Sequence, residues 1–240
     1  MKFKHSIFAL LVLLSPGFQA WADNSDEIES VKFEKFVSPI YPYGLTFEGV
    51  VDGDVEIAVD INKDGTIDDW FPLRSSHVKF TREIGRVIDQ WVFKPILKDG
   101  VAIPMVLHMS FHFTFQGVIS LTAGDQSHLF FNPSTGGSEK DRLVFNLSEL
   151  DRIPTPIEVA QPKGVLGLDP EAAVGRVMIE FIIDTEGNVR LPVVREIEGP
   201  IELAYTAFDS ISSWKFEPPV RNNRIVSARV RQSFVFSPVK

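Results

Sequence analysis

The sequence contains no cysteine among its 240 residues. This absence excludes disulfides, thiol catalysis, zinc–thiolate sites and lipid attachment through an N-terminal cysteine, so packing alone must stabilise the fold. The chain also has no basic cluster, and its formal net charge is −8 at pH 7. Because a protein that binds nucleic acid needs a basic face to contact phosphates, the composition speaks against a nucleic-acid partner.

Long apolar runs are scarce as well. Near the N-terminus an unbroken run extends only from Ile7 to Leu14, which is too short to cross a bilayer core of roughly 30 Å. Two lysines precede this run, and the small-x-small segment Ala20-Trp21-Ala22 follows it. This pattern is typical of a cleaved signal peptide over residues 1–22, with an uncleaved anchor as the alternative. No later segment is apolar enough to span a membrane.

Two similar segments organise the rest of the chain: Trp91-Val92-Phe93-Lys94-Pro95 and Trp214-Lys215-Phe216-Glu217-Pro218. Gly65 lies 26 residues before the first tryptophan, and Gly187 lies 27 residues before the second. Two phenylalanines follow each tryptophan at equal spacing: Phe111 and Phe113, then Phe234 and Phe236. The glycine, the tryptophan segment and the phenylalanine pair recur in the same order, which indicates an internal duplication.

The sequence pattern of each half predicts a hairpin, then a helix, then a last strand. In the first half, alternating residues 54–61 and 67–73 flank a glycine turn, a helix capped by Ser76 ends before Pro95, and a strand covers Ile103 to Phe115. The corresponding segments of the second half are 177–183, 189–195, 203–214 and Ile225 to Phe236. We therefore predict an α+β fold with two tandem ββαβ domains, at 23–116 and 142–240, joined by a flexible linker at 117–141. Residues 143–147 can form one more strand, in either sheet.

The repeated segments and the turn glycines are predicted to be structural. Each tryptophan ends an amphipathic helix on its buried side, and each glycine lies where a turn needs a positive φ. The predicted structural core consists of Gly65, Trp91, Phe93, Pro95, Gly187, Trp214, Phe216 and Pro218.

Motifs that would carry chemistry are weak. Residues 60–68 match the first nine positions of a calcium loop, but Phe71 stands where the twelfth position needs a carboxylate, so a hairpin turn is favoured. Ser76 and Lys79 fit a Ser-x-x-Lys pattern without its companion motifs, and helix capping explains the serine better. His108 and His112 are too far apart on a strand to share one metal. The sequence therefore predicts no enzyme, no metal and no cofactor.

The same residues resemble the C-terminal domain of the TonB energy transducer. The family's pieces are a Pro-x-Tyr-Pro entry, a Gly-x-Val-x-Ile strand, an Asp-x-x-x-Gly hairpin and a helix that ends in Trp-x-aromatic-Lys/Glu-Pro. In the first half these are residues 39–42, 53–57, 60–65 and 91–95. The second half matches at 175–179, 184–187 and 214–218, but its entry at 161–164 lacks the tyrosine and the second proline. The transducer's membrane helix and proline-rich spacer have no counterpart in this sequence.

The resemblance implies a periplasmic, non-catalytic module that grips an extended segment of an outer-membrane transporter or a related envelope protein by strand addition. It implies partner contact by the entry residues Pro39, Tyr41 and Pro42, although Tyr41 can equally pack over the sheet. Arg229 and Arg231 lie on the last strand of the second half. A cationic edge there suits an acidic segment, and it also prevents aggregation. The alternatives are a soluble envelope scaffold or a peptidoglycan-associated structural protein, and a homodimer stays open.

Overall fold

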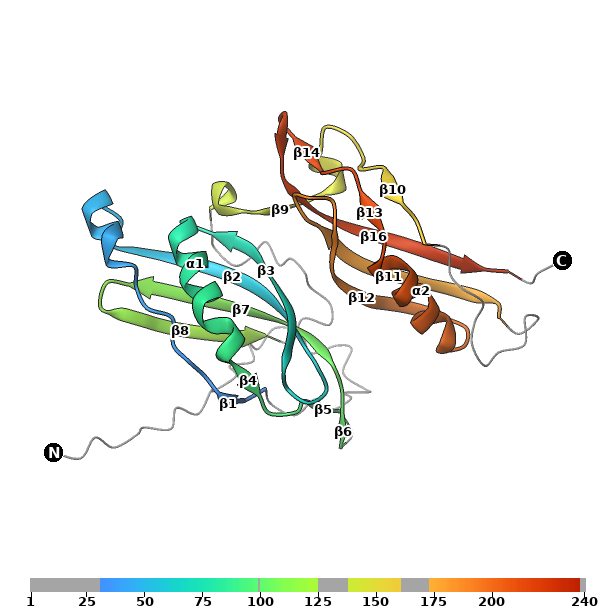
Figure 1. Ribbon diagram of the computed structural model, residues 1–240, viewed down its shortest axis with the longest axis horizontal. Helices are drawn as coiled ribbons and strands as arrows, with labels where there is room; N and C mark the ends of the chain where they lie inside the picture. The colour runs from blue at the N-terminus through green and yellow to red at the C-terminus, as the bar shows by residue number, and fades with distance from the viewer. Residues whose placement is uncertain (1–30, 99, 125–137, 161–172, 238–240) are drawn as a thin grey trace, which may run out of the picture. The chain divides into compact units, whose positions relative to one another are not determined.

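The computed structural model describes residues 31–98, 100–124, 138–160 and 173–237 (Figure 1). The predicted signal peptide at 1–22 therefore lies outside the described residues. The chain divides into two compact units, one made of Met1–Asp68 and His77–Thr135 and the other of Asp69–Ser76 and Gly136–Lys240. Within the described residues, none of the helices has the length and apolar content that a membrane crossing requires.

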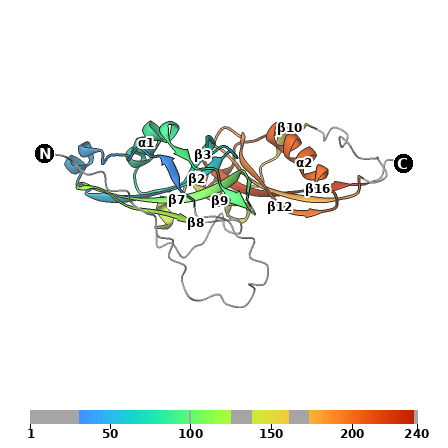
Figure 2. The ribbon, with the colours of Figure 1, turned by 90° about the horizontal axis from the view of Figure 1, so that it is seen from below.

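The first sheet contains four strands in the order β3-β2-β7-β8. Its strands are β2 (Asp52–Ile61), β3 (Ile67–Ser75), β7 (Met105–Thr114) and β8 (Gly117–Gly124). Helix α1 (Val78–Val87) covers one face of this sheet, and the short 3-10 helix η2 (Ile88–Gln90) continues it (Figure 2). Five short elements complete this half: β1 (Phe33–Lys35), η1 (Tyr43–Glu48), β4 (Val92–Phe93), β5 (Leu97–Lys98) and β6 (Val101–Ala102).

The second sheet also contains four strands, in the order β12-β11-β16-β9. These are β11 (Gly175–Ile183), β12 (Val189–Glu198), β16 (Ser227–Phe236) and β9 (Val144–Asn146), which alone is parallel to its neighbour. Helix α2 (Glu202–Ser212) packs on β11 and β12 (Figure 1). The remaining elements are η3 (Glu139–Asp141), η4 (Leu147–Glu149), β10 (Pro156–Glu158), β13 (Lys215–Phe216), β14 (Val220–Arg221) and β15 (Arg224–Ile225). The predicted α+β class with small antiparallel sheets is confirmed.

Alternation along the strands places the cores where the sequence predicts them, between each helix and its sheet. In the first half the buried residues on β2 and β7 include Val55, Ile57, Val59, Ile61, Leu107, Met109, Phe111 and Phe113, and helix α1 adds Phe80 and Ile84. In the second half the core comprises Val177, Ile179, Phe181, Ile183, Leu203, Ala204, Ala207, Ile211, Phe216, Val230 and Phe234. Helix α2 buries Leu203, Ala204, Ala207, Ser210 and Ile211, whereas Phe208 is 36% exposed.

The turn glycines make the same close contact in both halves. Gly65 and Gly187 each have a φ of 87°, which favours glycine. A Cβ on Gly65 would lie 1.9 Å from the Phe93 carbonyl oxygen, and one on Gly187 would lie 2.0 Å from that of Phe216. The N–H of each phenylalanine donates to the carbonyl of its glycine at 2.8 Å. The hairpin turn is thereby fixed to the segment that follows the helix.

The tryptophans also make matching contacts. The Trp91 indole Nε1 donates to the Val37 carbonyl at 2.7 Å, and Trp214 Nε1 donates to the Ala160 carbonyl at 2.9 Å, an acceptor 54 residues upstream in each case. Trp91 is 2% exposed under the rings of Phe33 and Phe36, whereas Trp214 is only half-buried. Among the other predicted core residues, Phe93 and Phe216 are buried, but Pro95 is exposed and Pro218 half-buried. The prolines direct the chain out of the core and do not fill it.

Three local features differ from the sequence prediction. Helix α1 is capped by His77, whose Nδ1 accepts from the Lys79 N–H at 3.2 Å, and not by Ser76. Residues 117–124, predicted to begin a linker, form strand β8, because their aliphatic and β-branched residues follow a two-residue turn after β7. The extra strand at 143–147 is β9, and it joins the second sheet.

The unequal burial of the two tryptophans predicts unequal costs of removing them. Trp91→Ala leaves a fully buried cavity and should lower the free energy of unfolding by about 3–5 kcal/mol. Trp214→Ala removes a half-exposed ring and should cost about 1–3 kcal/mol. Urea denaturation followed by circular dichroism measures both, and a Trp214→Ala variant that loses as much as Trp91→Ala would contradict this ranking.

Candidate functional site

The outer edge of β16 is the candidate site, because a strand at the edge of a sheet offers backbone N–H and C=O groups to a partner. On one side β16 pairs with β11 from Ala228 to Phe236. On the other side β9 covers only Ser227, Ala228 and Arg229. Among the residues that the structure describes, no strand pairs with the outer side of Val230–Phe236.

The edge of the last strand in the first half is filled. Strand β7 pairs with β2 along its whole length and with β8 from His108 to Thr114. The sequence offers the last strand of either half, Ile103–Phe115 or Ile225–Phe236, as the edge for strand addition, and in the structure β8 pairs with the first of these two. The physical reason is the hairpin from β7 to β8, which supplies from within the chain the strand that a partner would provide.

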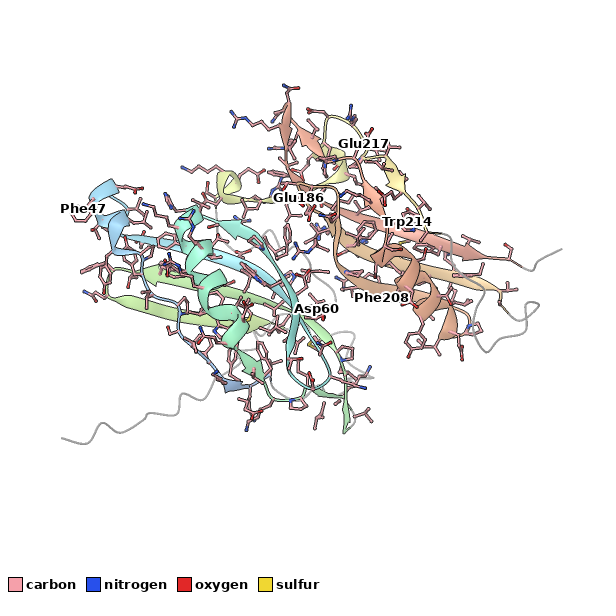
Figure 3. The ribbon with its side chains drawn as sticks, in the orientation of Figure 1. Phe47, Asp60, Glu186, Phe208, Trp214 and Glu217 are labelled. Atoms are coloured by element: carbon pink, nitrogen blue, oxygen red, sulfur yellow. The ribbon has the colours of Figure 1, made fainter. Side chains whose placement is uncertain are left out.

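Two faces flank the open edge of β16. Side chains alternate along a strand, so Val230 and Phe234 point into the core under α2, while Arg229 and Arg231 point to the opposite face of the sheet. Trp214 lies at the end of α2, with its ring centroid 5.6 Å from that of Phe234 (Figure 3). One face beside the edge is therefore apolar and the other cationic.

Glu180 is the centre of the cationic face. Its side chain is 1% exposed, and its two carboxylate oxygens accept from Arg195 Nη2 at 3.2 Å and from Arg231 Nε at 2.5 Å. Arg229 Nη2 donates to Asn146 Oδ1 of β9 at 2.7 Å. Burial lowers the pKa of Arg229, and the positive charges of Arg231, Arg195 and Arg142 lower it further, although Glu180 opposes them.

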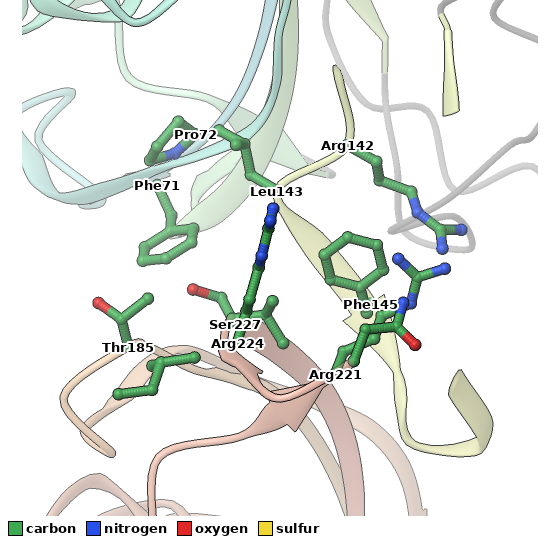
Figure 4. A pocket seen from close by; sticks show the side chains of 12 residues that line it. Phe71, Pro72, Arg142, Leu143, Phe145, Thr185, Arg221, Arg224 and Ser227 are labelled. Carbon is green, nitrogen blue, oxygen red and sulfur yellow. The ribbon is translucent and has the colours of Figure 1, made fainter. Parts of the chain in front are cut away.

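Strand β9 is held in place by its own cationic contacts. Two guanidinium groups lie over the ring of Phe145, with Arg142 Cζ at 4.7 Å and Arg221 Cζ at 4.4 Å from its centroid. All three side chains line the pocket shown in Figure 4. Arg142 also pairs with Glu149, whose second carboxylate oxygen accepts the Asn146 N–H at 2.8 Å. These contacts fix β9 at the beginning of the β16 edge.

The partner-binding residues predicted from the sequence belong to two different units of the chain. Arg229 and Arg231 flank the open edge of β16, in the second half. Pro39 and Tyr41 are buried in the first half and Pro42 is half-buried. The Tyr41 hydroxyl donates to the Val50 carbonyl, and burial raises the pKa of this phenol. Packing is therefore the role that the structure shows for Tyr41.

Two features of the site carry no sequence motif. In the sequence, Glu180 is one more polar residue of an alternating strand. The arginines lie near it because Glu180 pairs in register with Arg231 of β16 and with Val193 of β12. Residues 144–146 are too few for their pattern to name a partner strand. No three His, Asp or Glu side chains gather into a metal site within the described part of the chain.

The buried carboxylate predicts a stability difference between two Glu→Gln variants. Glu180→Gln removes the charge that two arginines share and should lower the free energy of unfolding by about 1.5–3 kcal/mol. Glu198→Gln is the matched control, because Glu198 pairs with Arg176 in the same sheet but both side chains are more than half exposed. The control should lose no more than about 1 kcal/mol. Equal losses in urea denaturation would show that Glu180 contributes as a surface residue does.

In comparisons with known proteins, the family match lies in the second half of the chain. Residues 170–238 match the family model of the Gram-negative bacterial TonB protein C-terminal. This supports one copy of that domain and not the two tandem copies that the sequence predicts. A solution NMR structure of the Pseudomonas aeruginosa TonB C-terminal domain is 27% identical, with 39% of this chain and 89% of that chain covered and a TM-score of 0.28. No curated protein matches.

Proposed function

We propose that this chain is a non-catalytic, periplasmic protein-binding protein whose second half binds an extended segment of an outer-membrane transporter or another envelope protein by strand addition to β16. The observation that carries the proposal is the edge Val230–Phe236, which has no pairing strand on its outer side among the described residues. The family match at 170–238 includes this edge and supports a protein-interaction module. The partner class and the compartment come from the resemblance to TonB C-terminal domains.

Strand addition suits this edge physically. A peptide laid along β16 could form main-chain hydrogen bonds with groups that no described strand pairs, and its alternate side chains would contact the two faces of the sheet. The sheet offers a rigid template, since β16 is paired with β11 from Ala228 to Phe236. The neighbouring β9 ends at Asn146, and η4, which follows it, also contacts β16, so a bound strand would pair with β16 beyond both elements.

We further propose that the two halves are tandem copies of one fold with different states of the edge. The support is the recurrence of contacts: glycine to phenylalanine backbone in both hairpins, and tryptophan Nε1 to a carbonyl 54 residues upstream. In the first half β8 pairs with β7 over seven registered pairs, while β9 covers three residues of β16. The first half is therefore complemented internally, and the second half carries the binding edge.

A titration followed by NMR tests the binding edge. A peptide from the N-terminal region of an outer-membrane transporter should shift the backbone amides of Val230–Phe236 in the labelled chain and leave Met105–Thr114 unchanged. The matched control is the same peptide with alternate backbone amides N-methylated, which keeps the side chains but cannot complete the ladder. No saturable shift at millimolar peptide, or shifts scattered over α2, would favour a scaffold role over strand addition.

Opening the first edge provides a second test. Proline cannot donate to a ladder, so Ser120→Pro combined with Thr122→Pro should release β8 from β7. A peptide that binds β16 should then also shift amides of Met105–Thr114, and the stoichiometry should rise from one to two. Ser120→Ala with Thr122→Ala is the control and should bind one peptide. A proline variant that keeps β7 exposed, as shown by fast amide exchange, yet still binds one peptide would refute the tandem assignment.

A further inference from the structure

The tryptophan that follows each helix has different surroundings in the two units. Trp91 is 2% exposed, and its ring centroid lies 5.8 Å from that of Phe33 and 5.1 Å from that of Phe36. Both phenylalanines belong to the segment that begins with β1. Trp214 is only half-buried, although it occupies the same place in its own unit. The difference therefore comes from what covers the ring.

The segment that covers Trp91 has a counterpart in the second unit. The pairing of β1 with β4 matches that of β10 with β13, which places Pro156 at the position of Phe33. In both units the indole donates to a carbonyl 54 residues upstream, and the residue just before that carbonyl is Phe36 in one and Val159 in the other. Pro156 and Val159 carry no ring, and both are exposed. The second unit keeps the tryptophan but lacks the two rings of the first.

The ring of Trp214 is nevertheless held in a fixed position. Its Nε1 donates to the Ala160 carbonyl at 2.9 Å and to Ser210 Oγ at 3.2 Å. Its centroid lies 6.0 Å from that of Phe216 and 5.6 Å from that of Phe234, and both phenylalanines belong to the core. Because the polar edge of the indole already has its hydrogen bonds, the part of the side chain that remains accessible is apolar.

We propose that Trp214, Pro156 and Val159 form a socket for one aromatic side chain of a protein partner. The first unit shows which chemistry fits, because two phenylalanine rings occupy the corresponding place beside its own tryptophan. Aromatic pairs contribute more than the area they bury, and a ring that is already fixed loses little freedom on binding. The socket uses no backbone group of the β16 edge, so this inference goes beyond the proposed strand addition and does not depend on it.

The size of the socket limits what it can bind by itself. One aromatic side chain buries about 150–250 Å², whereas a stable interface buries about 800 Å² on each partner. The occupant is therefore one residue of a larger contact between proteins. A single amino acid should bind the socket weakly, with a dissociation constant in the millimolar range or above.

The test compares N-acetyl-phenylalanine amide with N-acetyl-leucine amide in titrations followed by NMR. The phenylalanine probe should shift the Nε1–H signal of Trp214 and bind about two- to tenfold more tightly than the leucine probe, because aromatic pairs add to the burial that both share. The Nε1–H signal of Trp91 should not move in the same spectra. This signal is the internal control, since its ring is already covered.

Variants of the cover segments assign the effect to the socket. Val159→Phe restores a ring of the first unit, so it should abolish the probe-dependent shift of Trp214 and raise the urea midpoint. Ile157→Phe is the matched control, because Ile157 is also exposed and its counterpart in the first unit is the exposed Glu34. The control should bind the probe as the unchanged chain does.

The reciprocal variant creates the socket in the first unit. Phe36→Val removes a side chain that is 39% exposed, so the fold should remain intact. The Nε1–H signal of Trp91 should then respond to the phenylalanine probe, as that of Trp214 does in the unchanged chain. An unresponsive Trp91 signal in this variant would contradict the role assigned to the missing rings.

Three results would overturn the inference. The first is that the phenylalanine probe shifts neither indole signal, or both alike. The second is that Val159→Phe, with an unchanged circular dichroism spectrum, still binds the probe at Trp214. The third is that the Trp214 signal moves with protein concentration alone, which would make a second copy of the chain the occupant. None of these results bears on the amides of Val230–Phe236, so strand addition stands or fails separately.

Discussion

The contact between each hairpin glycine and the backbone after the helix is the constraint on which the rest of each half depends. A side chain at Gly65 or Gly187 would overlap the carbonyl of Phe93 or Phe216, so only glycine lets the two segments touch. The contact joins the hairpin to the chain that leaves the helix, and the adjacent tryptophan then bonds to a carbonyl far upstream. Turn, helix end and N-terminal segment are thereby held around one core.

That shared frame leaves the sheet edge as the place where the halves differ. Both last strands carry apolar residues on the helix side, and both pair antiparallel with the first strand of their hairpin. The edge of β7 is closed by a hairpin partner, and most of the edge of β16 is not closed by any described strand. Under the proposed strand addition, the first half would be complete by itself and the second would accept a strand from elsewhere.

Much of the fold follows from the sequence because its signals are local. Alternation at 54–61 and 177–183, glycine turns and helical spacing before Trp91 and Trp214 predict elements that the structure contains. Edges are a different matter, because which strand lies beside β7 or β16 depends on pairing between distant segments. The sequence predicts a linker at 117–124, because the pattern of these residues does not show which strand they pair with. The arginines were visible in the sequence, but the buried carboxylate between them depends on register.

Strand β9 has a consequence for how long a ligand can be. It occupies the first three positions of the β16 edge and is anchored there by Phe145, whose ring contacts two guanidinium groups. As a tethered segment it competes at an effective concentration on the order of millimolar, which a free peptide at low concentration cannot match. In the proposed strand addition, a ligand strand on this edge would end where β9 begins, so β9 would limit both its length and its register.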